Sequence, residues 1–212
     1  MPNIFDAIDE AMKICWDENY GYRLSGHCAS YSDGCDCGGL IFHCLNKVGF
    51  SSIPDTSPGV HNMYPYLLNA GFTEVPYNRN TFVPKDGDII TMYNPNVTPH
   101  LGHAFFYTEN VRAYTDYRAL SNNIAIVNHV KVEASSNRGH SAPGDSTNGA
   151  NGAYWEVWVH AYYNLVDHSS YPNDNMVRVF RIEGAHRIPK FLFFSFNEHK
   201  KHPLPLPPNL LE

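Results

Sequence analysis

Charged residues are scarce in this chain of 212 residues, because Asp, Glu, Lys and Arg together make up 17% of it. The formal net charge is −6, which excludes the basic surface that nucleic acid or anionic lipid would require. No apolar run approaches the roughly 20 residues that span a bilayer. The hydrophobic fraction is nevertheless 43%, which is typical of a globular chain. We therefore expect a folded protein with no nucleic-acid or membrane partner.

An apolar leader is also missing from the N-terminal stretch. Asp6, Asp9 and Glu10 interrupt the apolar run that a secretory signal would need. We therefore expect synthesis in the cytoplasm without a signal peptide. Another agent would have to release the protein if it acts outside the cell.

Cysteines are few and occupy only the first quarter of the sequence, at positions 15, 28, 35, 37 and 44. This odd and locally clustered set does not indicate a disulfide framework. Cys28, Cys35, Cys37, His43 and Cys44 offer zinc ligands as an alternative. A structural zinc site, however, usually pairs two separated groups of ligands, and the second group is missing here.

Apolar residues at helical spacing predict helices in the first part of the chain. The first predicted helix covers residues 4–16. The second begins near Cys37 and ends at Gly49, a suitable C-cap. A third, short helix is expected over residues 59–70, ending at Gly71.

The pattern then changes to that of β-strands. The turn at Pro84–Gly87 leads into a predicted strand at 88–93. Further strands are predicted at 102–108, within 124–134, at 154–163 and at 176–182. Helices followed by an antiparallel meander indicate the α+β class.

The last part of the chain has a different composition. It contains the apolar patch Phe191–Phe194 and a Pro-rich stretch at 203–208, which favours an extended conformation. We therefore divide the chain into a domain at 1–182 and an extension at 183–212. The extension is too short to hold a core of its own and offers a surface for a partner protein.

Cys37 lies where the second helix is expected to begin. A helix N-terminus stabilises a thiolate, the reactive form of cysteine, through its unpaired N–H groups and its macrodipole. Asp36 stands in the capping position, and Gly38 and Gly39 leave the first turn bare, so that a substrate backbone could approach closely. Each glycine costs the helix roughly 1 kcal/mol relative to alanine, which suggests a use. A buried structural thiol is the alternative.

A catalytic cysteine also requires a base. His103 opens an apolar strand directly after Gly102, and His100 is a competing candidate. A third polar group should orient the imidazole, and Glu133 or Asn137 could do so. A surface histidine and a solvated strand glutamate are the structural alternatives.

Several motifs follow one another in order over residues 4–182. They are Asn19–Tyr22, Asp36–Ile41, Gly49–Phe50, Pro84–Ile90 and His103–Tyr107, and then the segments 132–135, 143–146, 161–164 and 179–181. This order resembles the NlpC superfamily of papain-like cell-wall cysteine peptidases, and in particular its bacteriophage endolysin branch. The resemblance implies a papain-like α+β fold, with N-terminal helices packed on a central antiparallel β-sheet.

The resemblance implies a peptidoglycan hydrolase that needs no metal or organic cofactor. Cys37 would attack an amide carbonyl of a stem peptide and form a thioester. His103 would protonate the leaving amine, and Glu133 would orient the imidazole. The resemblance also implies a substrate-binding or oxyanion role for Tyr22, Asp36, Gly38 and Asn137.

The chain departs from the family pattern at two places. Gly38 replaces the usual serine, although the backbone N–H groups for an oxyanion remain. The segment between His103 and Glu133 is longer than usual, and a glutamate as third residue is similar to the related CHAP hydrolases. Glu133 and Asn137 therefore both stay candidates for the orienting residue.

Alternatives of three kinds stay open at this point. The same fold could serve an N-acetylmuramoyl-L-alanine amidase, a non-catalytic wall-binding or virion structural module, or a zinc-binding module. As a lysin, the protein would reach the wall through a holin-made pore or as part of a virion. Its extension could dock on a phage partner protein.

Overall fold

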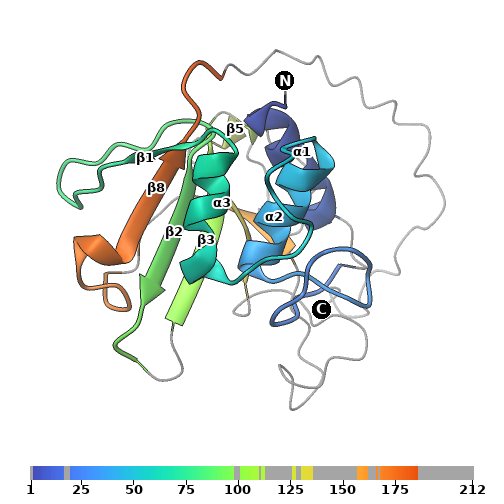
Figure 1. Ribbon diagram of the computed structural model, residues 1–212, viewed down its shortest axis with the longest axis horizontal. Coiled ribbons are helices and arrows are strands. Elements are labelled where there is room, and N and C mark those ends of the chain that lie inside the picture. Colours follow the sequence, from blue (N-terminus) through green and yellow to red (C-terminus); the bar gives the residue numbers. More distant parts are fainter. Residues whose placement is uncertain are drawn as a thin grey trace, which may run out of the picture.

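The structure is a computed structural model. It describes residues 2–16, 20–97, 101–109, 111–112, 126–127, 130–135, 157–161, 166 and 168–185. Most of its helical segments lie in the first third of the chain. They are α1 (Ile4–Trp16), α2 (Cys37–Lys47), the 3-10 helix η1 (Val60–Asn62) and α3 (Tyr64–Asn69) (Figure 1). The predicted helices at 4–16 and from Cys37 are confirmed. Gly49, at a φ of +97°, lies just beyond α2, as expected for a C-cap region.

A six-stranded antiparallel sheet has the strand order β1-β8-β2-β3-β6-β7. Its strands are β1 (Thr73–Val75), β2 (Ile89–Asn94), β3 (Leu101–Thr108), β6 (Val130–Ala134), β7 (Val157–Ala161) and β8 (Val177–Arg181). The strands β4 (Val111–Arg112) and β5 (Ile126–Val127) form a separate pair, and the 3-10 helix η2 (Asp174–Met176) precedes β8. The α+β class and the predicted strands are confirmed.

Two elements differ from the sequence prediction. The helix expected at 59–70 is divided into η1 and α3, because Pro65 lies in the first turn of α3 and a proline cannot continue a preceding helix. Strand β1 was not predicted, because its three residues are too few to show a period of two. Its pairing with Val179–Arg181 of β8 decides its conformation.

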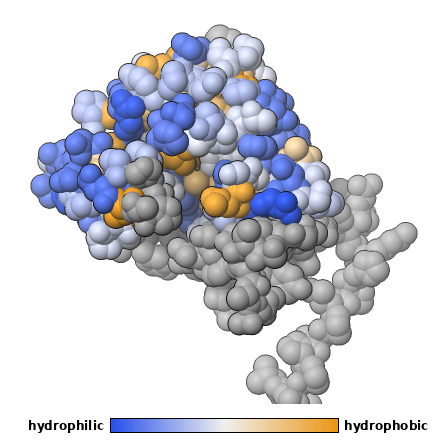
Figure 2. Space-filling model, turned by 60° about the horizontal axis from the view of Figure 1, so that its bottom comes forward, coloured by the Kyte–Doolittle hydropathy of each residue, from blue (hydrophilic) through white to orange (hydrophobic). Residues whose placement is uncertain are grey.

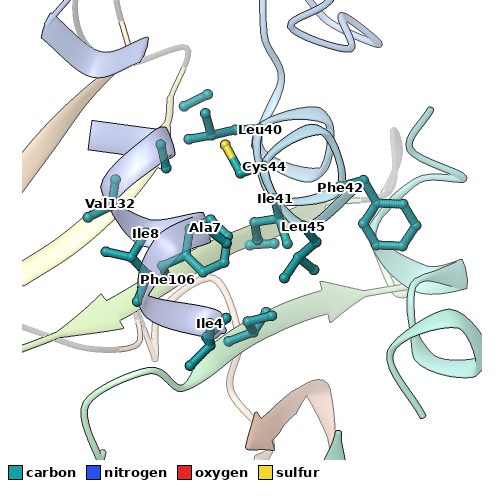
Figure 3. Packing of buried hydrophobic residues seen from close by; sticks show 14 of the residues in the cluster. Ile4, Ala7, Ile8, Leu40, Ile41, Phe42, Cys44, Leu45, Phe106 and Val132 are labelled. Atoms are coloured by element: carbon teal, nitrogen blue, oxygen red, sulfur yellow. The ribbon is translucent and has the colours of Figure 1, made fainter. Parts of the chain in front are cut away.

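Helices α1 and α2 pack together against β3 and β6, as Figure 3 shows. The residues that meet there are all buried: Ile4, Ala7 and Ile8 of α1, Leu40, Ile41, Cys44 and Leu45 of α2, Phe106 of β3 and Val132 of β6. Burial of one such aliphatic side chain contributes about 1.5–3 kcal/mol. This core therefore holds α2, and with it Cys37, in a fixed place beside the sheet.

The alternate residues of the central strands form a second buried cluster. It includes Ile90, Met92, Phe105, Tyr107 and Val179, together with residues of the segment before β8. Successive side chains of a strand point to opposite faces of the sheet. Burial on both faces therefore explains why Ala104–Tyr107 reads as one continuous apolar run.

A buried ion pair lies at the start of β2. Asp88 is fully buried, and Arg181 of β8 donates to both of its carboxylate oxygens at 2.7 and 2.8 Å. The backbone N–H of Lys85 also donates to Asp88, at 2.8 Å. Hydrogen bonding to Asp88 raises the pKa of Arg181. The turn at Pro84–Gly87 is thereby tied to the last strand of the sheet.

One pair of cysteines forms a disulfide that the sequence analysis did not predict. Cys28 and Cys35 are joined, with their Cα atoms 4.6 Å apart. The loop between them folds back on itself, because Asp33 accepts hydrogen bonds from the N–H groups of His27 and Ala29. A single bridge between two cysteines seven residues apart does not produce the spacing pattern of a disulfide framework.

The structure describes only the first residues of the predicted extension. Residues 183–185 follow β8, and the apolar patch and the Pro-rich stretch lie outside the described residues. In the part of the chain that the structure covers, no helix is both long and apolar enough to cross a membrane.

Candidate active site

Cys37 is the first residue of α2, and Asp36 is its N-cap, as the sequence predicted. The two carboxylate oxygens of Asp36 accept hydrogen bonds from the N–H groups of Gly39 and Ser25. Burial raises the pKa of Asp36 above its ordinary value, while these amide hydrogen bonds oppose the rise. The carboxylate that was expected to bind substrate thus binds the protein's own backbone and fixes the start of the helix.

The two glycines after Cys37 make room for the protein's own loops. A Cβ on Gly39 would lie 1.9 Å from the carbonyl oxygen of Gly26, and a Cβ on Gly38 would lie 2.4 Å from Ser57 Oγ. The open sides of these glycines are therefore already filled. We expected both glycines to leave space for a substrate backbone, and this was wrong at the positions that their Cβ atoms would take.

His103 and Glu133 lie on neighbouring strands just beyond the end of their ladder. The register of β3 and β6 comprises three residue pairs and ends with Phe106 opposite Val132. Past this point, His103 Nε2 and Glu133 Oε2 form a hydrogen bond of 2.7 Å. The Glu133 side chain is 6% exposed and the His103 side chain 22%. The carboxylate is therefore the buried partner, and the imidazole reaches the surface.

The His103 imidazole forms a second hydrogen bond, with the side chain of Cys37. Burial by itself lowers the pKa of His103, but the charge of Glu133 and the hydrogen bonds to Cys37 and Glu133 outweigh burial and raise the pKa to about 10. Because Glu133 occupies Nε2, Nδ1 is the ring nitrogen left for the thiol. The structure thus brings Cys37, His103 and Glu133 into one hydrogen-bonded line.

A lysine lies next to this line. Lys131 Nζ is 3.8 Å from Glu133 Oε2 and 5.2 Å from the centre of the Phe105 ring. Glu133 therefore faces two cations, Lys131 and the protonated His103.

The remaining predicted site residues have different positions. Tyr22 is buried and forms a parallel bridge with Cys35, two residues before Cys37. Asn137 and the competing base candidate His100 lie outside the described residues.

The surface around the site mixes polar and apolar groups. Leu24 is 68% exposed and precedes Ser25, whose N–H binds the helix cap. Leu101 is 40% exposed and lies two residues before His103. Figure 2 shows hydrophobic residues between hydrophilic ones on the face that it views. This surface therefore offers both polar and apolar contacts.

Sequence reasoning missed two residues near Cys37. Ser57 lies against Gly38, and its N–H donates to His27 Nδ1 at 3.3 Å. No spacing or motif could have indicated them, because the loop after α2 has to fold back before they meet. The glycine at position 38 was the one local sign that something occupies this space.

The zinc alternative loses ligands in the structure. Cys28 and Cys35 are bonded to each other, and burial raises the pKa of Cys44 well above its ordinary value. Among the described residues, no three His, Cys, Asp or Glu side chains form a group that could hold a metal ion.

Comparison with known proteins does not assign the chain to a family, because no family model, no curated protein and no solved structure matches it.

Proposed function

We propose that this chain is a phage-type peptidoglycan hydrolase, a cysteine peptidase that cleaves an amide bond in cell-wall stem peptides. The observation that carries the proposal is the hydrogen-bonded line of Cys37, His103 and Glu133 at the N-terminus of a helix held in the core. Such a line has the parts that a thiol nucleophile needs: a base in contact and a third group that orients the base. The resemblance to the NlpC superfamily supplies the substrate class and the papain-like form of the fold.

The resting site would hold a thiolate and an imidazolium. A His103 pKa of about 10 keeps the imidazole protonated near neutral pH, and a cation beside Cys37 stabilises its thiolate. Glu133 fixes the ring through Nε2, so Nδ1 carries the proton that faces the thiol. The proton needed later for the leaving group is therefore already in place.

In the first half-reaction, Cys37 Sγ forms a bond to the amide carbonyl carbon and the carbonyl oxygen becomes an oxyanion. When this intermediate collapses, the C–N bond breaks and His103 Nδ1 gives its proton to the amine. In the second half-reaction, water adds to the thioester and gives a proton to neutral His103. The C–S bond then breaks and restores the thiolate with its imidazolium.

The oxyanion would be bound by the N–H of Cys37. The Asp36 carboxylate already engages the N–H groups of Gly38 and Gly39, so these two are directed away from the substrate. Tyr22, buried in the same loop, is the second donor that the family resemblance implies. In this proposal Gly38 serves the site through its missing side chain rather than through its N–H.

A digest of purified cell walls tests the proposal. The wild-type protein is expected to release new amine ends detectable by mass spectrometry, and Cys37→Ala is expected to release none. The products also identify the bond, because an N-acetylmuramoyl-L-alanine amidase alone separates lactyl-muramic acid from L-alanine. Wild-type lytic activity in Cys37→Ala would contradict the proposal and would favour a different catalytic centre.

Delivery and partners belong to the same proposal. In this proposal the protein reaches the wall through a holin-made pore or as part of a virion. The extension at 183–212 would contact a phage partner protein in the second route. Detection of the protein in purified virions, or only in lysates, distinguishes the two routes.

A further inference from the structure

Ser57 lies directly against the residue that follows the proposed nucleophile. A Cβ on Gly38 would lie 2.4 Å from Ser57 Oγ and 3.4 Å from Ser57 Cβ. The first of these distances is too short for two non-bonded atoms, so the hydroxyl occupies space that a side chain at position 38 would need. The Ser57 hydroxyl is thereby placed beside the first turn of α2, next to Cys37.

The segment that begins at Ser57 continues toward the proposed base. It leads into η1, where Val60 Cβ lies 3.4 Å from the position that a Cβ on Gly102 would take. Gly102 directly precedes His103 on β3. Segment 57–60 therefore runs along one side of the site, from the surroundings of the nucleophile to those of the base.

Ser57 is held in this position by its neighbours. Its N–H donates to His27 Nδ1 at 3.3 Å, and the N–H of Gly59 donates to Ser57 Oγ at 3.2 Å. The side chain of Asn46 on α2 anchors the same loop through the carbonyl of Ile53, at 2.6 Å. Within the described residues, the Ser57 hydroxyl accepts this one hydrogen bond and donates none. Ser57 is partly exposed, so a ligand at this surface can approach the residue.

We propose that Ser57 is a substrate-binding residue, whose hydroxyl donates a hydrogen bond to a carbonyl oxygen of the peptide lying across the N-terminus of α2. The proposal rests on the proposed function, which supplies a peptide substrate. A peptide has a carbonyl at every residue, and a donor beside Cys37 meets the one adjacent to the attacked amide. This hydrogen bond is present in the bound substrate as well as in the transition state. It therefore contributes to KM rather than to kcat.

Steady-state kinetics on soluble muropeptides, released from purified Gram-positive walls by a muramidase, tests this role. Ser57→Ala is expected to raise KM about fivefold, the size of one neutral hydrogen bond, and to leave kcat within about twofold. Ser57→Thr keeps the hydroxyl and is expected to restore most of the affinity. Ser52→Ala, at an exposed serine of the same loop, is the matched control with wild-type values. An unchanged KM in Ser57→Ala, or a loss confined to kcat, overturns the role.

Binding without turnover separates this proposal from the function on which it rests. Cys37→Ala and the double variant Cys37→Ala/Ser57→Ala are titrated with the same muropeptides by calorimetry. About fivefold weaker binding by the double variant supports the role of Ser57, even if the wild-type protein cleaves nothing. Equal affinities, or no binding by Cys37→Ala, overturn it. Absence of cleavage by the wild-type protein, in contrast, counts against the proposed function alone.

Discussion

Two buried carboxylates of the same sheet each hold a cation, but in different ways. Asp88 is fully buried and binds Arg181 through both carboxylate oxygens, at 2.7 and 2.8 Å. Glu133 is nearly buried and binds His103 through one oxygen, at 2.7 Å. The Asp88 pair lies where β2 begins, whereas the Glu133 pair lies where the ladder of β3 and β6 has ended.

The identity of the cation separates a structural pair from one suited to catalysis. A guanidinium stays charged at any ordinary pH and has only N–H groups to offer, so Arg181 can hold Asp88 but cannot transfer a proton. An imidazole has two ring nitrogens and can lose its proton. His103 therefore binds Glu133 with one nitrogen and leaves the other for Cys37. Burial and short distances are common to both pairs and do not distinguish them.

The largest effect is expected from removal of the imidazole. His103→Ala takes away the proton donor and the cation beside Cys37, so kcat on muropeptides should fall by about 10²–10⁴-fold. His103→Ala also leaves the buried Glu133 carboxylate without its imidazole, so the melting temperature should fall as well, and kcat is therefore measured on the folded fraction. His168→Ala, at an exposed histidine, is the control and should keep full activity. If His103→Ala kept more than half of the wild-type kcat, the Glu133–His103 pair would have no catalytic role.

Loss of the buried charge at Asp88 should act on stability instead. Asp88→Asn leaves Arg181 without its carboxylate, and breaking such a buried pair costs about 3–5 kcal/mol. Urea unfolding measures this change, and kcat of the folded fraction should remain near the wild-type value. The surface pair of Asp174 and Arg79 provides the control, because Asp174→Asn should leave the unfolding midpoint nearly unchanged. Equal midpoints for Asp88→Asn and the wild type would contradict the structural role of the pair.

The pH dependence of the Glu133 pair gives the third test. The pKa of His103 is raised from 6.5 to about 10, so the stabilisation from this pair is fully present below pH 6.5 and is lost as pH rises toward 10. Activity that needs the imidazolium should decline over the same alkaline range. In Glu133→Gln the raising charge is gone and burial still lowers the pKa, so the alkaline limb of kcat/KM should move to lower pH.

A matched substitution sharpens this measurement. Glu74→Gln removes a carboxylate of β1 that pairs with Arg178 of β8 and should leave the alkaline limb of kcat/KM in place. The stability lost in Asp88→Asn should be the same across this pH range, because Arg181 does not titrate there. If the alkaline limb of Glu133→Gln coincides with that of the wild type, Glu133 does not set the charge of His103.

Local signals in the sequence were sufficient for most elements. The helix at 4–16, the start of α2 at Cys37 and the strands of the central sheet follow from apolar spacing and from the residues at their ends. The three-residue strand β1 and the division of the third helix could not be read in this way. The first depends on its partner β8, and the second on a single proline whose effect overrides the apolar spacing.

The candidate site was predictable only in part. The residue types at Cys37, His103 and Glu133 suggested a nucleophile, a base and an orienting group, but twelve histidines made the choice of base depend on family resemblance. The disulfide between Cys28 and Cys35 and the contact of Ser57 with Gly38 were not predicted. Both depend on loops that fold back, which neither periodicity nor spacing encodes.

The sequence by itself determined the fold class, the capped start of α2 and the chemical types available at the site, because these follow from side-chain patterns over a few neighbouring residues. Only the tertiary structure decided which carboxylate meets an imidazole and which meets a guanidinium. Asp88 and Glu133 both lie between apolar residues in the sequence. The number of residues that separates them from Arg181 and His103 does not indicate which side chains touch. The sheet register and the end of the β3–β6 ladder made these choices, since hydrogen-bonded pairing between distant strands sets which side chains can touch.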